Sequence, residues 1–324
     1  MSSTGETMSR MQSGAFAGSP GEIAERIVAR IAAEPSDRVI AVVGATGVGK
    51  SSVADAVARV LDAEIVSADS MQVYRGMDIG TAKVPVEKRG VPYHCLDLVD
   101  PGQPYSASLY QRDARAAIED IHSRGKRAIV CGGTGLYVRA ALDDMRFPAG
   151  EQVSNPVRER YERIAAEEGP ERLHAMLAEA DPESAALIHP NNVRRVVRAF
   201  EMLDEGVSYA EQNKGFDSFE PYYDALYFGL TMDTDLLYAA IDRRVDAMMD
   251  AGLLDEVRTL ADRGFADAIT SSQAIGYKEF LDAFAGECTI EEAVESVKRS
   301  TRRYSKRQRT WFKRDPRIEW FEVR

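Results

Sequence analysis

The sequence predicts an α/β fold: a doubly wound parallel sheet that is interrupted by an inserted all-helical subdomain. Three observations lead to this prediction. Short, continuously apolar runs alternate with longer segments of helical spacing, as expected for strands buried on both faces of a parallel sheet. A glycine-rich turn at residues 44–51 joins the first such run to a helix. Between residues 150 and 215 the apolar runs stop, and only helical, charge-rich segments follow.

The first 36 residues are expected to form a flexible N-terminal extension with one short helix. The opening segment, MSSTGETMSRMQSGAFAGSPG, is rich in Ser and Gly and lacks the apolar stretch of a signal peptide. Residues 21–34 have helical spacing, with Ile23, Ile27 and Ile31 four positions apart. Pro35 then ends this helix.

The α/β core is predicted at residues 37–149 and 216–324, on both sides of a helical insertion at 150–215. Strands are expected at 39–43, 64–68, 127–132, 225–232 and 317–323. Core helices are expected at 50–61, 107–124, 135–145, 234–262 and 289–313, and insertion helices at 156–168, 171–180 and 191–205.

The composition is that of a water-soluble protein with a substantial core. The chain has 324 residues, enough for two domains, and 44% of them are apolar. No run approaches the roughly 18 apolar residues of a membrane helix, so we expect no membrane partner and a cytoplasmic location. The three cysteines, at 95, 131 and 288, lie far apart and are expected to be free thiols.

The charge is distributed unevenly along the chain. The formal net charge is −11, yet residues 298–317, KRSTRRYSKRQRTWFKRDPR, carry +9 and leave −20 for the rest. A basic strip on an acidic body favours a polyanionic partner that docks at one place. The alternative is a solvated basic face of a helix.

Residues 44–51 match the phosphate-binding pattern G-x-x-x-x-G-K-S. The pattern consists of Gly44, Ala45, Thr46, Gly47, Val48, Gly49, Lys50 and Ser51. Glycines let backbone N–H groups point at phosphate oxygens, Lys50 supplies a charge, the Ser51 hydroxyl can bind Mg²⁺, and the next helix directs its positive end at the site. A strand before the motif and a helix after it predict a P-loop NTPase-like core. The alternative is a plain glycine-rich turn.

Asp69 is the one strand-end acid near this loop in the predicted sheet. It follows the strand at 64–68, where ligands bind in open α/β sheets. A carboxylate at this place could bind Mg²⁺ or act as a general base, and the alternative is a helix N-cap.

Several further motifs give the chain a resemblance to the tRNA dimethylallyltransferase family, over residues 39–315. After residues 44–51 these motifs are DSMQVYR (69–75), DIGTAK (78–83), YS (105–106), QRD (111–113), GGTGLY (132–137), HPN (189–191) with Arg195 and Arg198, QAIGYK (273–278) and RYSKRQ (303–308). Unrelated motifs in the same order make the resemblance specific.

The resemblance implies a reaction. The diphosphate of dimethylallyl diphosphate would lie in the 44–51 loop with Mg²⁺ as cofactor. A flipped-out adenine beside the anticodon of a tRNA would present N6 to the allyl carbon. The family acts on the adenosine 3′ of the anticodon in tRNAs that read codons starting with U, and we expect a monomer that binds the anticodon stem-loop.

The resemblance also assigns roles to single residues. Asp69 becomes the general base, and Lys50 and Thr134 the other catalytic groups. Thr134 could hold the adenine or the diphosphate, or else cap the helix that follows. Arg244 matches an arginine expected at the diphosphate; from spacing alone it is a surface cation.

The tRNA-binding residues that we expect lie in four parts of the chain. They are Asp69, Ser70, Met71, Gln72, Arg195, Arg198, Lys278, Arg303 and Arg307. The Gln72 amide suits adenine, although it could also be a polar loop residue. Arg195 and Arg198 could instead pair with Glu201 and Asp204. Trp311 and Phe312 are expected in the core.

Two other functions remain open from the residues alone. A P-loop small-molecule kinase would need a nucleotide-base pocket and an acceptor hydroxyl. A non-enzymatic RNA-binding protein would use the loop as a switch and show no turnover.

Overall fold

The computed structural model describes residues 16–147, 156–265, 268 and 271–324. The described residues form two compact units: one comprises those within 1–142 and 221–324, and the other those within 143–220. None of the described helices combines the length and the apolar character that crossing a membrane requires.

A parallel sheet organises the first unit, as predicted. In the described residues it has seven strands in the order β1-β7-β6-β2-β5-β3-β4. They are β1 (Phe16–Gly18), β2 (Val39–Gly44), β3 (Ala63–Ser67), β4 (Tyr93–His94), β5 (Arg127–Gly132), β6 (Ala225–Thr231) and β7 (Ile318–Val323). Every residue of β2 and β3 is buried, which explains the uninterrupted apolar sequence of β2; in β3 the buried residues include Glu64 and Ser67. The carboxyl ends of β2, β5 and β3 lie at the same end of the sheet; glycine-rich segments follow β2 and β5, and Asp69 follows β3.

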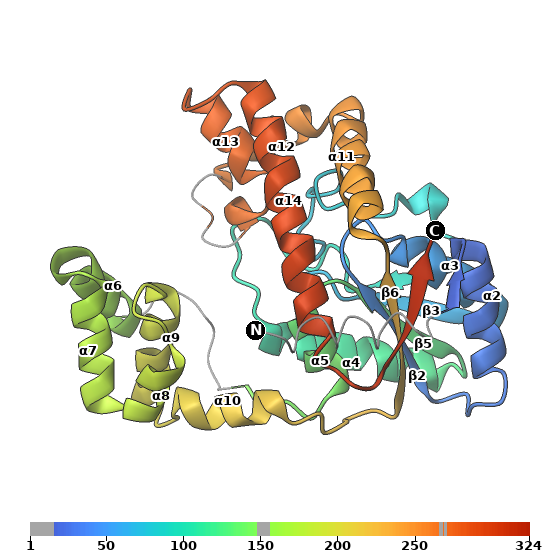
Figure 1. Ribbon diagram of the computed structural model, residues 1–324, viewed down its shortest axis with the longest axis horizontal. Helices are drawn as coiled ribbons and strands as arrows, with labels where there is room; N and C mark the ends of the chain where they lie inside the picture. The colour runs from blue at the N-terminus through green and yellow to red at the C-terminus, as the bar shows by residue number, and fades with distance from the viewer. Residues whose placement is uncertain (1–15, 148–155, 266–267, 269–270) are drawn as a thin grey trace. The chain divides into compact units, whose positions relative to one another are not determined.

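The expectation of a flexible N-terminal extension is wrong for residues 16–36. β1 pairs in parallel with β7, with Phe16 opposite Phe321. Ser19 and Glu22 form a capping box at the start of α2 (Pro20–Ile31), whose isoleucine face is fully buried. Figure 1 shows α2 beside α3 (Lys50–Leu61), against the sheet. This face is buried because α3 and the neighbouring strands cover it. Residues 1–15 lie outside the described part.

Six more helices belong to the first unit in the described residues. They are α4 (Ala107–Ser123), α5 (Gly135–Leu142), α11 (Thr234–Asp250), α12 (Leu253–Ala261), α13 (Lys278–Phe284) and α14 (Ile290–Phe312). The last four gather at one end of the unit (Figure 1). The single helix expected at 234–262 is two helices, because Gly252 takes a φ of 97° and starts α12 in a new direction.

The second unit is helical, as predicted. It contains α6 (Pro156–Glu168), α7 (Pro170–Ala180), α8 (Pro182–Leu187), α9 (Val193–Asp204) and α10 (Tyr209–Asp217). Leu173, Leu177 and Val196 are fully buried in a core of its own, and Tyr161 stacks on Phe200 with 3.9 Å between the ring centroids. The unit extends beyond the expected 150–215, because the Asp144 N–H bonds the Glu220 carbonyl at 2.9 Å and closes its base.

Candidate active site

The predicted phosphate-binding loop has the required backbone. It leaves β2 at Gly44 and enters α3 at Lys50. Gly47 and Gly49 have φ values of 84° and 91°, which favour glycine. No side chain caps α3, so the first N–H groups of the helix remain available to an anion. The backbone is thus suited to an anion, and phosphate binding at this loop stays a prediction.

Lys50 lies folded over this loop. Its Nζ donates to the Ala45 carbonyl at 2.7 Å. Burial lowers the pKa of the Lys50 ammonium to about 8; the Arg244 cation adds to the shift, and Cys131 and Asp69 oppose it. An anion bound in the loop would restore the charge that burial disfavours.

Asp69 lies beyond the end of β3, in a turn and not at the start of a helix. Its Oδ1 accepts the Met71 N–H at 2.9 Å, which fixes the carboxylate without making it a helix cap. Thr134 lies beside it: its Oγ1 accepts the Ser70 N–H at 3.1 Å. The hydroxyl of Thr134 therefore binds the Asp69 turn.

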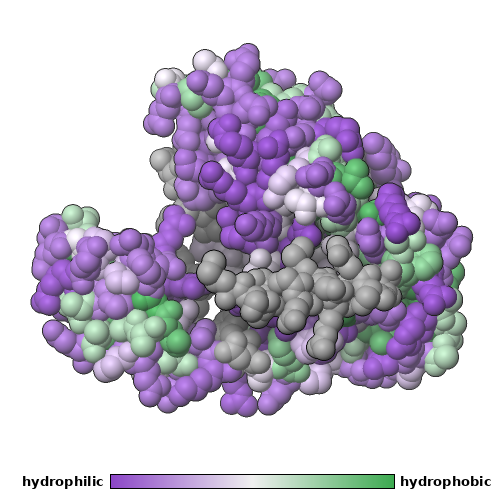
Figure 2. All heavy atoms as spheres, in the orientation of Figure 1, coloured by the Kyte–Doolittle hydropathy of each residue, from purple (hydrophilic) through white to green (hydrophobic). Residues whose placement is uncertain are grey.

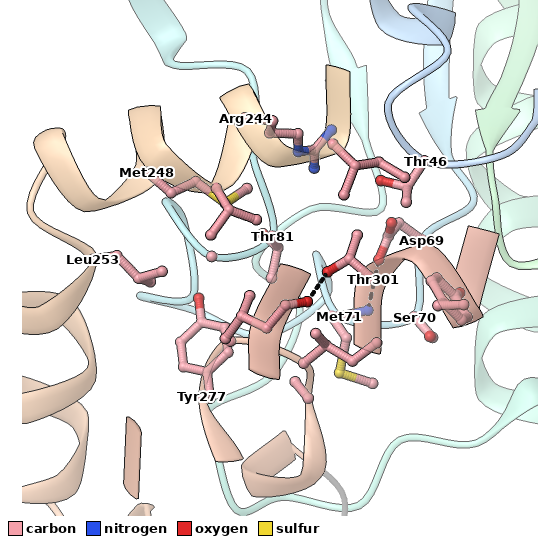
Figure 3. Close-up of a pocket in the computed structure, with 18 of the residues that line it drawn as sticks. Thr46, Asp69, Ser70, Met71, Thr81, Arg244, Met248, Leu253, Tyr277 and Thr301 are labelled. Carbon is pink, nitrogen blue, oxygen red and sulfur yellow. Dashed lines mark hydrogen bonds between the residues drawn. The ribbon is translucent and has the colours of Figure 1, made fainter. Parts of the chain in front are cut away.

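A cavity of about 320 Å³ joins these segments. Figure 3 shows Thr46, Asp69 and Arg244 around one end, and Met248 and Leu253 at the other. The lining residues are Thr46, Asp69, Ser70, Met71, Gly80, Thr81, Ile241, Arg244, Val245, Met248, Leu253, Gln273, Ala274, Ile275, Gly276, Tyr277, Val297, Thr301, Tyr304 and Arg307. One end of the cavity is polar and charged, and the other is mostly apolar.

Arg244 and Tyr304 complete the polar end. Burial lowers the pKa of the Arg244 guanidinium, and Asp69 opposes the shift. Within the described residues Arg244 makes no ion pair, so its charge is available to a ligand. Burial, with a smaller contribution from Asp69, raises the pKa of Tyr304 to about 12, so its hydroxyl stays neutral at physiological pH. Tyr304 comes from the basic strip, and its place in the cavity was not predicted from the sequence.

Gln308 connects two loops of the site. Its Oε1 accepts the Thr46 N–H at 2.8 Å, and its Nε2 donates to the Gly133 carbonyl at 2.9 Å. A Cβ on Gly133 would lie 2.3 Å from that nitrogen, so a glycine is needed for the approach. One buried amide on α14 thus sets the distance between the phosphate loop and the turn that carries Thr134.

Gln72 is placed differently from Ser70 and Met71, which line the cavity. Its Oε1 accepts from the Ser67 hydroxyl at 2.8 Å, and its Nε2 donates to the Thr81 carbonyl at 3.1 Å. Both ends of the amide are engaged inside the fold, so its contribution in this conformation is to hold the loop.

The basic strip presents two faces on α14. Figure 2 shows hydrophilic residues over this helix, and Arg303 and Arg307 are exposed. Phe312 is buried, which confirms its predicted core position, and Trp311 packs on Gly135, where a Cβ would lie 2.0 Å from the indole. Lys278, outside the strip, pairs with Asp282 at 2.6 Å.

In the helical unit the two expected arginines differ. Arg198 is half-buried and lies 3.5 Å from Glu201, which also pairs with Arg158 at 2.9 Å. Arg195 is exposed and forms no ion pair with a carboxylate in the described residues. The alternative of an internal salt bridge therefore holds for Arg198 and not for Arg195.

Fold and site together define a class: α/β proteins in which a glycine-rich loop between a strand and a helix borders a partly open, mostly apolar cavity. Two family models match the chain, "IPP transferase" over residues 72–315 and "Isopentenyl transferase" over residues 37–89. The chain belongs to the IPP transferase family.

Individual relatives are similar over most of their length. The chain is 47% identical over 293 residues to a tRNA dimethylallyltransferase of Geobacillus thermodenitrificans, covering 89% of this chain and 91% of the relative. It is 48% identical over 288 residues to that of Thermobifida fusca, covering 87% and 89%.

Two solved structures are also similar to most of this chain. A tRNA isopentenylpyrophosphate transferase from Bacillus halodurans has 43% identity and a TM-score of 0.65, with 89% of this chain and 90% of that chain covered. A eukaryotic dimethylallyltransferase acting on tRNA has 30% identity and a TM-score of 0.74, with 88% and 73% covered.

Proposed function

We propose that this enzyme transfers a dimethylallyl group from dimethylallyl diphosphate to N6 of the adenosine 3′ of the anticodon, in tRNAs that read codons starting with U. Diphosphate is the other product. The observation that carries the proposal is the cavity that joins the phosphate loop, at Thr46, to the Asp69 carboxylate and Arg244. An electrophile held by its diphosphate and a base for an incoming amine would then share one cavity.

The polar end suits a leaving diphosphate. N–H groups at the start of α3, the Lys50 ammonium and the Arg244 guanidinium all supply positive charge there. Charge neutralisation of this kind is what an allyl diphosphate needs in order to leave.

Mg²⁺ is the proposed cofactor, held by Ser51. Its hydroxyl is exposed beside the loop. Magnesium usually takes one or two protein oxygens and completes its shell with substrate phosphates and water, so a single hydroxyl suits it. When bound, the ion would neutralise charge on the departing diphosphate.

Asp69 is the proposed general base. The Met71 N–H orients one of its oxygens, and the carboxylate lines the cavity. As N6 forms its bond to the allylic carbon, the bond from that carbon to the diphosphate oxygen breaks. Asp69 accepts the N6 proton. An adenine must leave its stack to reach this depth.

Four exposed cations and the half-buried Arg198 are the proposed contacts to the anticodon stem-loop. Arg303 and Arg307 on α14, Lys278 at the start of α13, and Arg195 and Arg198 on α9 can meet backbone phosphates. Asp69, Ser70, Met71 and Gln72 would lie closest to the flipped base.

Mass spectrometry of a tRNA incubated with dimethylallyl diphosphate and Mg²⁺ tests the proposal. The tRNA is unmodified and reads codons starting with U. We expect one dimethylallyl group on the adenosine 3′ of the anticodon. Asp69→Ala should lose at least about 10²-fold in rate, whereas Asp255→Ala, at an exposed carboxylate of α12, should match the wild type. An untouched tRNA with consumption of ATP and a small alcohol would establish the kinase function instead.

A further inference from the structure

The Glu256 carboxylate on α12 accepts four hydrogen bonds from two other segments of the chain. Its Oε2 accepts the N–H groups of Asp78 at 3.0 Å and Ile79 at 2.7 Å. Its Oε1 accepts the Gly80 N–H at 3.1 Å and the Tyr277 hydroxyl at 2.6 Å. Three successive backbone N–H groups on one carboxylate form an anion nest, here filled by the protein itself.

The segments joined by Glu256 form one wall of the cavity. Gly80, Thr81 and Tyr277 line it, as does Leu253 in the first turn of α12. Gly80 lies flat against Tyr277, since a Cβ would lie 2.5 Å from its ring. Any change in the position of the 78–81 segment therefore changes the width of the cavity.

Lys83 holds the same segment from the other side. Its Nζ is almost fully buried and bonds the Tyr74 carbonyl at 2.6 Å, Asp78 at 2.7 Å and Asp97 at 2.5 Å. Lys83 thus fixes where the segment begins and ends. Glu256 is the group that fixes its middle, where it faces the cavity.

Hydrogen bonds through Gln72 link the position of this wall to the end of the cavity that contains Asp69. The Thr81 carbonyl accepts the Gln72 amide at 3.1 Å, and the other end of that amide accepts from Ser67 at the end of β3. Asp69 lies in the short stretch between Ser67 and Gln72. A displaced 78–81 segment therefore pulls on the turn that carries the proposed base.

We propose that Glu256 is a positioning residue for the transfer reaction: it holds the 78–81 segment and Tyr277 together as one cavity wall and so keeps the allyl group aligned with the incoming amine. This inference rests on the proposed function. None of the four hydrogen bonds to Glu256 involves the phosphate loop. A change at Glu256 therefore tests the alignment of the reactants separately from diphosphate binding.

Glu256→Gln tests the inference with little change in shape. A neutral amide has one acceptor oxygen and cannot satisfy all four donors. We expect kcat to fall by about 10- to 100-fold, the size of loss typical for misplaced reacting groups. The affinity for inorganic diphosphate with Mg²⁺ should stay within about twofold, because the phosphate loop is untouched. Asp255→Asn, at the neighbouring exposed carboxylate, is the matched control and should change neither quantity.

Two more measurements separate positioning from general destabilisation. Tyr277→Phe removes one of the four donors and leaves the backbone nest, so its kcat should lie between those of wild type and Glu256→Gln. Hydrogen exchange at the amides of residues 78–80 needs no turnover and should speed up in Glu256→Gln alone.

The outcomes are distinct. An unchanged kcat for folded Glu256→Gln overturns the inference, as does a parallel loss of kcat and diphosphate affinity. If wild type transfers no dimethylallyl group, the proposed function fails. In that case unchanged exchange at 78–80 would still contradict the positional role of Glu256, and faster exchange would still support it.

Discussion

Raising the pH from 7 to 9 should weaken the binding of dimethylallyl diphosphate to the free enzyme about tenfold, through the Lys50 ammonium. Burial lowers the pKa of this group to about 8. About nine in ten molecules then carry the charge at pH 7, and about one in ten at pH 9. Bound diphosphate favours the charged form, so binding above pH 8 must take up a proton. The contribution of Lys50 to the affinity is therefore constant below about pH 7 and falls as the pH rises through 8.

The other titratable groups that face Lys50 do not change their protonation between pH 7 and 9. Burial raises the pKa of the Cys131 thiol to about 11, and an arginine such as Arg244 stays protonated. The ligand's terminal phosphate loses its last proton near pH 6. Titration calorimetry without tRNA, in two buffers with different ionisation enthalpies, gives the affinity and the proton uptake together.

Lys50→Arg is the matched control, because its charge persists through the whole range. Its affinity for the ligand, whatever its absolute value, should be flat between pH 7 and 9. A wild-type affinity that changes less than twofold over this range would refute the reasoning, and so would the same slope in Lys50→Arg.

Two stability predictions follow from other contacts. Gln308→Leu leaves the Thr46 N–H and the Gly133 carbonyl unpaired, so the free energy of unfolding in urea should fall by about 1–3 kcal/mol. An unchanged midpoint for Gln308→Leu would contradict the role of this amide. The hydrogen bond from Arg124 is the largest cause that lowers the pKa of the buried Glu64 to about 2, so its stabilisation is present above about pH 4.5 and is lost as the pH falls toward 2. Glu64→Gln should therefore cost about 1–2 kcal/mol at pH 7, a value reduced because Arg124 is partly exposed, and much less at pH 3. Equal losses in urea unfolding at the two pH values would contradict the assignment.

The sequence predicts most of the sheet because parallel strands buried on both faces must be continuously apolar. It fails for β1, since three residues cannot carry a periodic signal and the partner, β7, lies at the far end of the sequence. The break between α11 and α12 was marked by Gly252, but a single glycine inside a helical pattern does not by itself distinguish a break from a tolerated residue.

For the site, the sequence identifies groups on strand ends and loops better than groups on helices. The placing of Asp69 beside the 44–51 loop follows from sheet topology, and the cavity joins them. Gln72 shows the limit of residue type as a guide, because an amide suited to a base is equally suited to two partners in the fold. Spacing could have found Gln308: with Ser305 and Phe312 it forms the buried face of a helix that its charges make look exposed.

The strand order has a consequence for biosynthesis. β7 lies between β6 and β1, although it is made last of the described strands and β1 is made first. During synthesis on the ribosome, the edge of β6 that includes Tyr227 and Phe228 stays unpaired until β7 has been made. Until then β1 and the apolar face of α2 have no completed sheet edge to pack on. Open strand edges are sites of wrong pairing. A nascent chain that stalls before residue 318 would therefore contain the phosphate loop but lack β7, the strand between β6 and β1. Such a chain would be bound by chaperones or degraded and would not be catalytically active.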